Sequence, residues 1–360
     1  MDTCISENNQ KKVRIKAFDI LKLYAIFLVL WGHSIQYFLS SNFYDEPMYR
    51  IIYSFHMPLF MMISGYFSTS SMSLLPFEFL KKKFVQLILP ILSWCVVLGI
   101  LFFFNHSMES SIVKLTIGEI LMWFYGPYPF WFLRTCFFCY LLAYCGFFFR
   151  INKYLWMLIS LIISQFVPYF VLADILYPCF IIGMELKDNH KFYGCICKYT
   201  IGLLGSFLFM LCFWDQFFWG LDGILKTIII NYMHIDSSFF LMTVSKFYRL
   251  IIGIVGSLAF IGIICSSFPQ EKTNKFIFIC SDWGQYTLGI YILQTLILET
   301  YMAKFILLDG LDFYLINFAI TPIISLFVLV LCVYIIKIMS RSRILAFLFF
   351  GNYKTSNIRN

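Results

Sequence analysis

The sequence contains ten long runs of predominantly apolar residues, separated by short polar segments. A helix needs about 20 apolar residues to cross the hydrocarbon core of a bilayer. The runs therefore predict transmembrane helices at 17–38, 50–68, 84–104, 128–149, 154–171, 173–187, 196–214, 246–267, 285–307 and 317–339. The sixth run is short and contains Pro178. Pro58 and Gly65 in the second run predict a kink or a break.

The composition agrees with membrane insertion. The chain is 61% hydrophobic and 13% charged, whereas soluble domains are about 45–50% apolar and about 25% charged. We predict an all-α polytopic membrane protein with about ten transmembrane helices. The expected organisation is an N-terminal tail at 1–16, one membrane domain at 17–340 and a C-terminal tail at 341–360. The longest connection, 215–245, is predicted to be an interfacial or re-entrant element, a lid over an outer cavity, or a loosely ordered connector.

Lysine and arginine recur in alternate connections, and this alternation predicts the orientation. The basic clusters lie at 11–16, 81–83, 150–153, 187–198, 272–275 and 337–359. Because basic residues are retained on the cytoplasmic side, both termini are expected to be cytoplasmic. This requirement also explains the net charge of +8 without a nucleic-acid partner.

The first run, FDILKLYAIFLVLWGHS at 18–34, carries three titratable groups. A charge at the centre of a membrane helix costs roughly 2.5–3.5 kcal/mol on insertion scales, so such groups face a partner or a watery cavity. Asp19 and Lys22 are three residues apart and can interact, so Asp19 is either an interfacial anchor or part of a site. Lys22 and His33 are eleven residues apart, which places them on one helical face roughly 16 Å apart. His33 is either a hydrogen-bonded packing residue or a proton-handling group.

Three further polar groups lie inside apolar runs. His56 opens YSFHMPLFMMISGYF at 53–67, where Pro58 and Gly65 allow close approach of another helix or a ligand. Arg134 is expected to pair with an acid, Asp174 or Glu185.

Gln294, in the ninth run, is expected to hydrogen-bond either to another helix or to substrate. The CxxC pair of Cys136 and Cys139 also lies in an apolar run, where cysteine behaves as a small hydrophobe, so no metal cofactor is expected.

Five motifs occur in an order that resembles the membrane acyltransferase 3 family, and in particular its fucose 4-O-acetylase-like sugar O-acetyltransferases. They are FDILKLYAIFLVLWGHS, FHMPLFMMISGYF, FLKKKFVQLILP, FWFLRTCFFCYLL and YTLGIYILQT. The resemblance covers nearly the whole chain. It implies a ten-helix domain in the bacterial cytoplasmic membrane. It further implies that the acyl donor is acetyl-CoA, or the coenzyme A ester of another short acyl group such as succinyl, and that the acceptor is a hydroxyl of a cell-surface or lipid-linked glycan.

The resemblance also implies roles for individual residues. Lys22 falls on the family's basic position in the first helix, and His33 falls on its essential histidine. Lys83 and Gln86 match an Arg-x-x-Arg pair, so one charge of that pair is replaced. Our hypothesis is that His33 is the catalytic base or acyl relay and that His56 orients the acyl group or the acceptor. Lys22, Lys81, Lys82 and Lys83 would hold the phosphates of the coenzyme.

Two other classes of function are compatible with the sequence. Transporters of lipids or glycans also place polar groups in interrupted membrane helices. A catalytically inactive relative is the other alternative, because the basic pair at 83 and 86 is incomplete. In every case membrane lipid is an expected partner.

Overall fold

The computed structural model describes residues 16–39, 43–105, 130–166, 173–215, 220–221, 238–268 and 274–351. Almost all of these residues are helical, and the only strands in this described part are the two-residue β1 (Trp214–Asp215) and β2 (Gly220–Leu221), which pair antiparallel. The helical class predicted from the apolar runs is confirmed. Most of the 215–245 connection lies outside the described residues.

Each of the ten predicted runs overlaps a helix. In chain order the main helices are α1 (Lys16–Phe38), α2 (Pro47–Tyr66), α4 (Pro76–Lys83), α5 (Leu89–Asn105), α7 (Trp131–Phe148), α8 (Lys153–Phe166), α9 (Ala173–Asp188), α10 (His190–Lys198), α11 (Thr200–Leu211), α13 (Ser238–Ser267), α14 (Lys275–Trp283), α15 (Thr287–Gln294), α17 (Thr321–Met339) and α18 (Arg343–Phe350). Short helices are η1 (Phe43–Asp45), α3 (Thr69–Met72), η3 (Gly284–Tyr286), η5 (Met302–Lys304) and α16 (Phe313–Leu315). Three segments are π-helical: η2 (Phe84–Ile88), η4 (Thr295–Tyr301) and η6 (Ile316–Ile320).

Five helical stretches in the described part are long and apolar enough to cross a membrane. They are Lys16–Phe38, Pro76–Ile100, Trp131–Phe148, Thr243–Ser267 and Phe313–Met339. α10 and α11, which meet at a bend of 69°, make a sixth if they count as one span. By length and composition alone the structure thus supports five or six spans, and the predicted number of ten stays a prediction.

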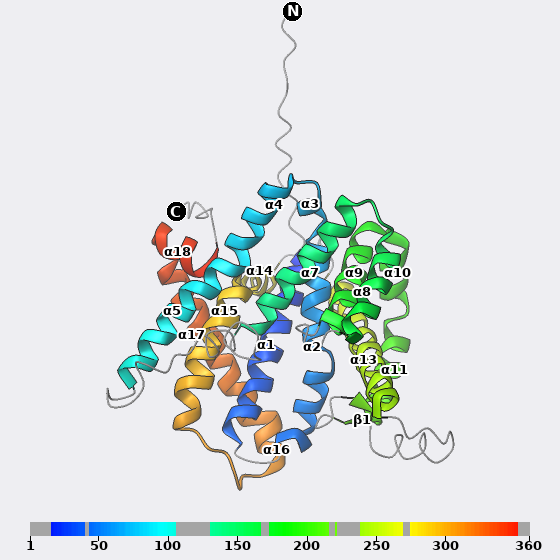
Figure 1. Cartoon of the computed structure of the whole chain (residues 1–360). Coiled ribbons are helices and arrows are strands. Elements are labelled where there is room, and N and C mark those ends of the chain that lie inside the picture. The colour runs from blue at the N-terminus through cyan, green and yellow to red at the C-terminus, as the bar shows by residue number, and fades with distance from the viewer. Residues whose placement is uncertain are drawn as a thin grey trace, which may run out of the picture.

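The molecule is a bundle with α1 and α2 near its centre (Figure 1). α4 and α18 lie at one end of the bundle, and α16 and β1 lie at the other. Hydrogen bonds fix α1 against α17: Trp31 Nε1 donates to Thr321 Oγ1 at 3.0 Å, and the hydroxyls of Ser34 and Ser325 lie 2.9 Å apart. Such polar contacts join helices where lipid offers no hydrophobic drive for association.

Of the kink or break predicted in this run, the break is contradicted, because α2 runs uninterrupted from Pro47 to Tyr66 with Pro58 inside it. Proline removes one helical hydrogen bond and crowds the carbonyl of the preceding turn. α13 packs directly against this point, since a Cβ on Gly253 would lie 2.7 Å from Pro58 Cγ. Ser257 of α13 also donates a hydrogen bond to the carbonyl of Phe55 at 3.2 Å. α13 therefore packs closely against the turn that Pro58 disturbs.

Gly65 serves the second purpose predicted for it, the close approach of another helix. A Cβ on Gly65 would lie 1.9 Å from the carbonyl oxygen of Phe180, and one on Gly183 would lie 2.0 Å from that of Met62. The backbones of α2 and α9 are thus in direct contact at a pair of glycines. This crossing joins the C-terminal part of α2 directly to α9.

We expect Gly183→Ala to lower the free energy of unfolding by about 1–3 kcal/mol, because the new methyl group meets rigid backbone instead of a movable side chain. Thermal melting of the detergent-purified protein measures the change. Gly205→Ala in α11 is the matched control, since no atom lies within 4 Å of its Cβ position. A melting temperature of Gly183→Ala equal to that of Gly205→Ala would contradict the close packing.

Candidate active site

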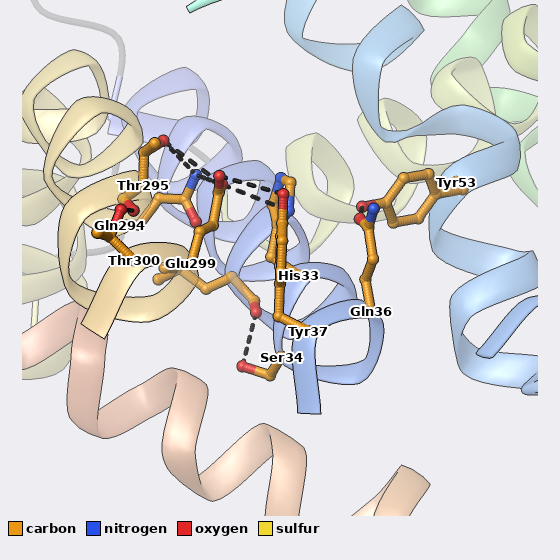
Figure 2. Close-up of polar contacts among 10 residues, drawn as sticks. His33, Ser34, Gln36, Tyr37, Tyr53, Gln294, Thr295, Glu299 and Thr300 are labelled. Atoms are coloured by element: carbon orange, nitrogen blue, oxygen red, sulfur yellow. Dashed lines mark hydrogen bonds and ion pairs between the residues drawn. The ribbon is translucent and has the colours of Figure 1, made fainter. Parts of the chain in front are cut away.

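His33 of α1 faces a carboxylate that the sequence analysis did not single out. Its Nδ1 lies 3.6 Å from Oε1 of Glu299, and the two side chains are 21% and 17% exposed. Partial exposure matters here, because a fully enclosed pair could not reach a substrate. Figure 2 shows that Glu299 approaches the imidazole from η4, on the opposite side from Gln36.

The π-helical turn of η4 is what gives Glu299 its direction. Successive residues of an α-helix are rotated by about 100°, so residues 294 and 299 would point roughly 140° apart. In a π segment, hydrogen bonds join residues five apart, and Gln294 and Glu299 therefore share a face. Gln294 Nε2 donates to Glu299 Oε1 at 2.8 Å and to Thr295 Oγ1 at 3.1 Å. Gln294, 1% exposed, thus supports Glu299, and the predicted bond to another helix is not found among the described residues.

Tyr37 holds the other carboxylate oxygen. Its hydroxyl donates to Glu299 Oε2 at 3.2 Å, and its ring stacks on His33 with centroids 5.7 Å apart. Tyr37 is one turn beyond His33 on α1. The same helical face therefore supplies both the imidazole and a hydrogen-bond donor to Glu299, the carboxylate that faces this imidazole. Both oxygens of Glu299 are therefore fixed by donors, with one of them facing His33.

The geometry suits a carboxylate–imidazole dyad. A carboxylate at Nδ1 favours the tautomer that carries its proton there, which leaves Nε2 with a free lone pair. The same carboxylate stabilises the imidazolium that forms when Nε2 takes a proton. The arrangement can thus activate a hydroxyl or another weak nucleophile.

His56 of α2 flanks this pair but is enclosed, with 3% of its surface exposed. Its Nδ1 lies 2.7 Å from the carbonyl oxygen of Ile52. Since a carbonyl only accepts, Nδ1 carries the proton. The ring of Tyr53 stands edge-on to both histidines, with centroids 4.7 Å from His56 and 6.2 Å from His33. The structure therefore brings both predicted histidines to one aromatic ring.

The predicted pair at the start of α1 is confirmed. Lys22 Nζ lies 3.1 Å from Asp19 Oδ1 and 4.0 Å from the centroid of the Phe67 ring. Asp19 is 5% exposed. Lys22 lies three turns, roughly 16 Å, from His33 along the helix axis. These two residues occupy different depths of the molecule.

A cavity of about 240 Å³ lies next to Lys83, near the end of the bundle that carries α4 and α18. Its polar lining includes Lys83, Gln86, Ser64 and Gln285, and Gly351 closes it from the C-terminal side. Lys83 is 4% exposed, with its Nζ 3.5 Å from Gln86 Oε1 and 3.5 Å from the ring centroid of Tyr140. Of the predicted lysine cluster, Lys81 is exposed, Lys82 is half-buried, and Lys83 alone lines this cavity.

Arg134 is buried at the start of α7. The preceding turn is formed by Phe130 at φ 76°, a conformation that costs a non-glycine residue about 1–3 kcal/mol and often marks functional sites. Of the two predicted partners of Arg134, Glu185 instead binds Lys153 at 2.5 Å, and the side chain of Asp174 lies outside the described residues.

A family model described as an acyltransferase domain matches residues 15–337. Two curated relatives are each named nodulation protein NolL. The protein from Mesorhizobium japonicum is 34% identical over 134 residues, which are 35% of this chain and 34% of the relative. The one from Sinorhizobium fredii is 36% identical over 100 residues, which are 27% of this chain and 26% of the relative. The chain therefore spans about a third or less of the curated relatives that it matches. No solved structure matches it significantly.

Proposed function

We propose that this chain, which belongs to the acyltransferase 3 family, is an integral membrane O-acetyltransferase that moves an acetyl group from acetyl-CoA to a glycan hydroxyl. The observation that carries the proposal is the dyad of His33 and Glu299, which is partly exposed and in which Tyr37 and Gln294 donate hydrogen bonds to the carboxylate. Acyl transfer to an alcohol needs a base for the hydroxyl proton. The dyad supplies one at an accessible position.

In the proposed reaction, the acceptor hydroxyl lies at Nε2 of His33. The imidazole takes the hydroxyl proton as the oxygen attacks the thioester carbonyl, and Glu299 stabilises the imidazolium. The tetrahedral intermediate then collapses with cleavage of the C–S bond. The His33 imidazolium returns its proton to the sulfur, so that coenzyme A leaves as the free thiol. Atoms and charge balance without a metal ion. His56 acts through Tyr53, whose ring it contacts, to keep the acceptor side in place.

The donor side of the proposal rests on the cavity beside Lys83. Its lysine and amide groups suit phosphate oxygens, with lysine acting as a point charge where the family pattern has the arginine fork. Lys22, Lys81 and Lys82 add positive charge at the predicted cytoplasmic face. We place both termini there, with ten spans, as the distribution of basic residues predicts.

For the acceptor, we propose a cell-surface or lipid-linked glycan, as in the fucose 4-O-acetylase-like subgroup. The named relatives come from rhizobial strains, which supports a bacterial cytoplasmic membrane as the location.

The proposal predicts that membranes containing the protein transfer label from [¹⁴C]acetyl-CoA to glycan. Membranes from a deletion strain of the source organism are the control, and mass spectrometry of its glycan should lack one acetyl mass per modified sugar. Movement of glycan across the membrane without label would identify a transporter instead. Neither label nor movement would identify an inactive relative.

A further inference from the structure

The side of His33 away from Glu299 carries an amide and an aromatic ring that the proposed chemistry does not use. Gln36 Oε1 accepts a hydrogen bond from the Tyr53 hydroxyl at 2.6 Å. Both side chains are half-buried, so both reach open space. The Nε2 group of Gln36 makes no hydrogen bond within the described part of the chain and retains two donors for a ligand. Figure 2 shows Gln36 and Tyr53 together beside His33.

Gly32 is the residue that permits this arrangement. A Cβ at this position would lie 2.6 Å from Cε2 of Tyr53, so any other residue would push the ring away from α1. Tyr49, one turn earlier on α2 and 1% exposed, stacks behind Tyr53 with centroids 3.9 Å apart. The ring of Tyr53 is therefore supported from behind and oriented by the Gln36 hydrogen bond. Tyr53 thus provides an aromatic ring in a fixed orientation next to the imidazole of His33.

We propose that Tyr53 and Gln36 bind the pyranose ring of the acceptor, with one sugar hydroxyl directed at His33. This inference rests on the proposed function and deepens it by assigning the acceptor site. A sugar ring presents an apolar C–H face that packs on an aromatic ring, and hydroxyls that hydrogen-bond to an amide. Tyr53 and Gln36 supply these two kinds of contact. Ligand sites typically combine such an apolar wall with a few placed polar groups.

The sign of the nearest charge indicates which part of the substrates, sugar or phosphate, each of the two sites can bind. Glu299 places its carboxylate against His33, on the side away from Gln36 and Tyr53, and this nearby negative charge disfavours a phosphate here. The cation of Lys83 lies instead at the separate cavity. The acceptor and the phosphates of the donor are thus assigned to different places by the sign of the nearest charge.

The test measures binding of methyl pyranosides to the detergent-purified protein by saturation-transfer NMR, without any donor present. Sorbitol, an acyclic polyol, is the matched ligand control. The wild-type protein should bind at least one methyl hexoside or 6-deoxyhexoside in preference to sorbitol. Tyr53→Leu should abolish this preference, Gln36→Leu should weaken binding about 10-fold, and Tyr53→Phe should keep the ring preference. Tyr24→Leu is the matched protein control, because Tyr24 of α1 stacks on Phe260 and not on this site.

Equal binding by wild type, Tyr53→Leu and Gln36→Leu would overturn the inference, as would a wild-type protein that binds no pyranoside. Melting temperatures within a few degrees of wild type show that the variants are folded. Transfer from acetyl-CoA is measured separately. A protein that binds pyranosides through Tyr53 but transfers no acetyl group would retain this site and refute the proposed enzyme.

Discussion

Replacing His33 with alanine is expected to lower acetyl transfer to glycan by about 100-fold or more, the loss typical of a missing general base. The imidazole is the group between the Glu299 carboxylate and the space beside Tyr53. Without it, the acceptor proton has no base at that position. Label from acetyl-CoA appearing in glycan measures the loss, and the amount of protein in the membrane is determined in parallel.

His190→Ala is the matched control for the His33 variant. His190 is an exposed residue at the start of α10, and its removal should leave transfer unchanged. Wild-type transfer by His33→Ala would exclude His33 as base and as acyl relay. A labelled acetyl group trapped covalently on the wild-type protein, and absent from His33→Ala, would favour the relay over the base.

Contacts within one regular helix were predictable from the sequence. The ten apolar runs locate the helices, because the length of an apolar run fixes where a helix can sit in lipid. The Asp19–Lys22 pair follows from a spacing of three residues, and it forms at 3.1 Å. These features depend on chain neighbours and on the regular geometry of the α-helix.

Features that depend on irregular helix geometry or on tertiary packing were not predictable in the same way. Glu299 was visible as an acid inside the ninth apolar run, but α-helical periodicity would point it away from Gln294. The π turn at 295–301 reverses that expectation. Of the two acids predicted as partners of Arg134, Glu185 pairs instead with Lys153 and joins α9 to α8, while the side chain of Asp174 lies outside the described residues. Spacing along the chain does not reveal such contacts.

The cavity beside Lys83 was only partly predictable from the sequence. The lysine run at 81–83 indicated an anion site, yet Lys83 alone turns inward. Besides α4, which carries Lys83, the cavity is lined by residues of α2, α7, α15, α17, α18, η2 and η3. α18, within the predicted C-terminal tail, is held there by a hydrogen bond from Trp94 Nε1 to the carbonyl of Phe349 at 3.2 Å. The local lysine motif thus predicted one residue of the cavity lining, whereas the other lining residues are brought together only by the fold.

The second large effect is expected for Glu299→Gln, which keeps the size of the side chain and removes its charge. Tyr37 and Gln294 both donate hydrogen bonds to the carboxylate, and an amide offers only one oxygen to receive them. Its NH₂ group, turned towards His33, would donate to Nδ1 and move the imidazole proton to Nε2, where the base is needed. We expect kcat to fall by about 10²–10⁴, as for the carboxylate of a catalytic triad, with KM for acetyl-CoA nearly unchanged.

Steady-state transfer from acetyl-CoA with purified Glu299→Gln checks this expectation. Glu185→Gln is the matched control, since it removes a carboxylate of similar exposure that pairs with Lys153 away from His33, and its kcat should stay near the wild-type value. A fall in kcat of less than about 10-fold, with a normal melting temperature, would show that Glu299 only packs beside His33. A large fall in kcat for Glu299→Gln, together with substantially higher activity for Glu299→Asp, would instead show that η4 provides a negative charge at Nδ1 of His33.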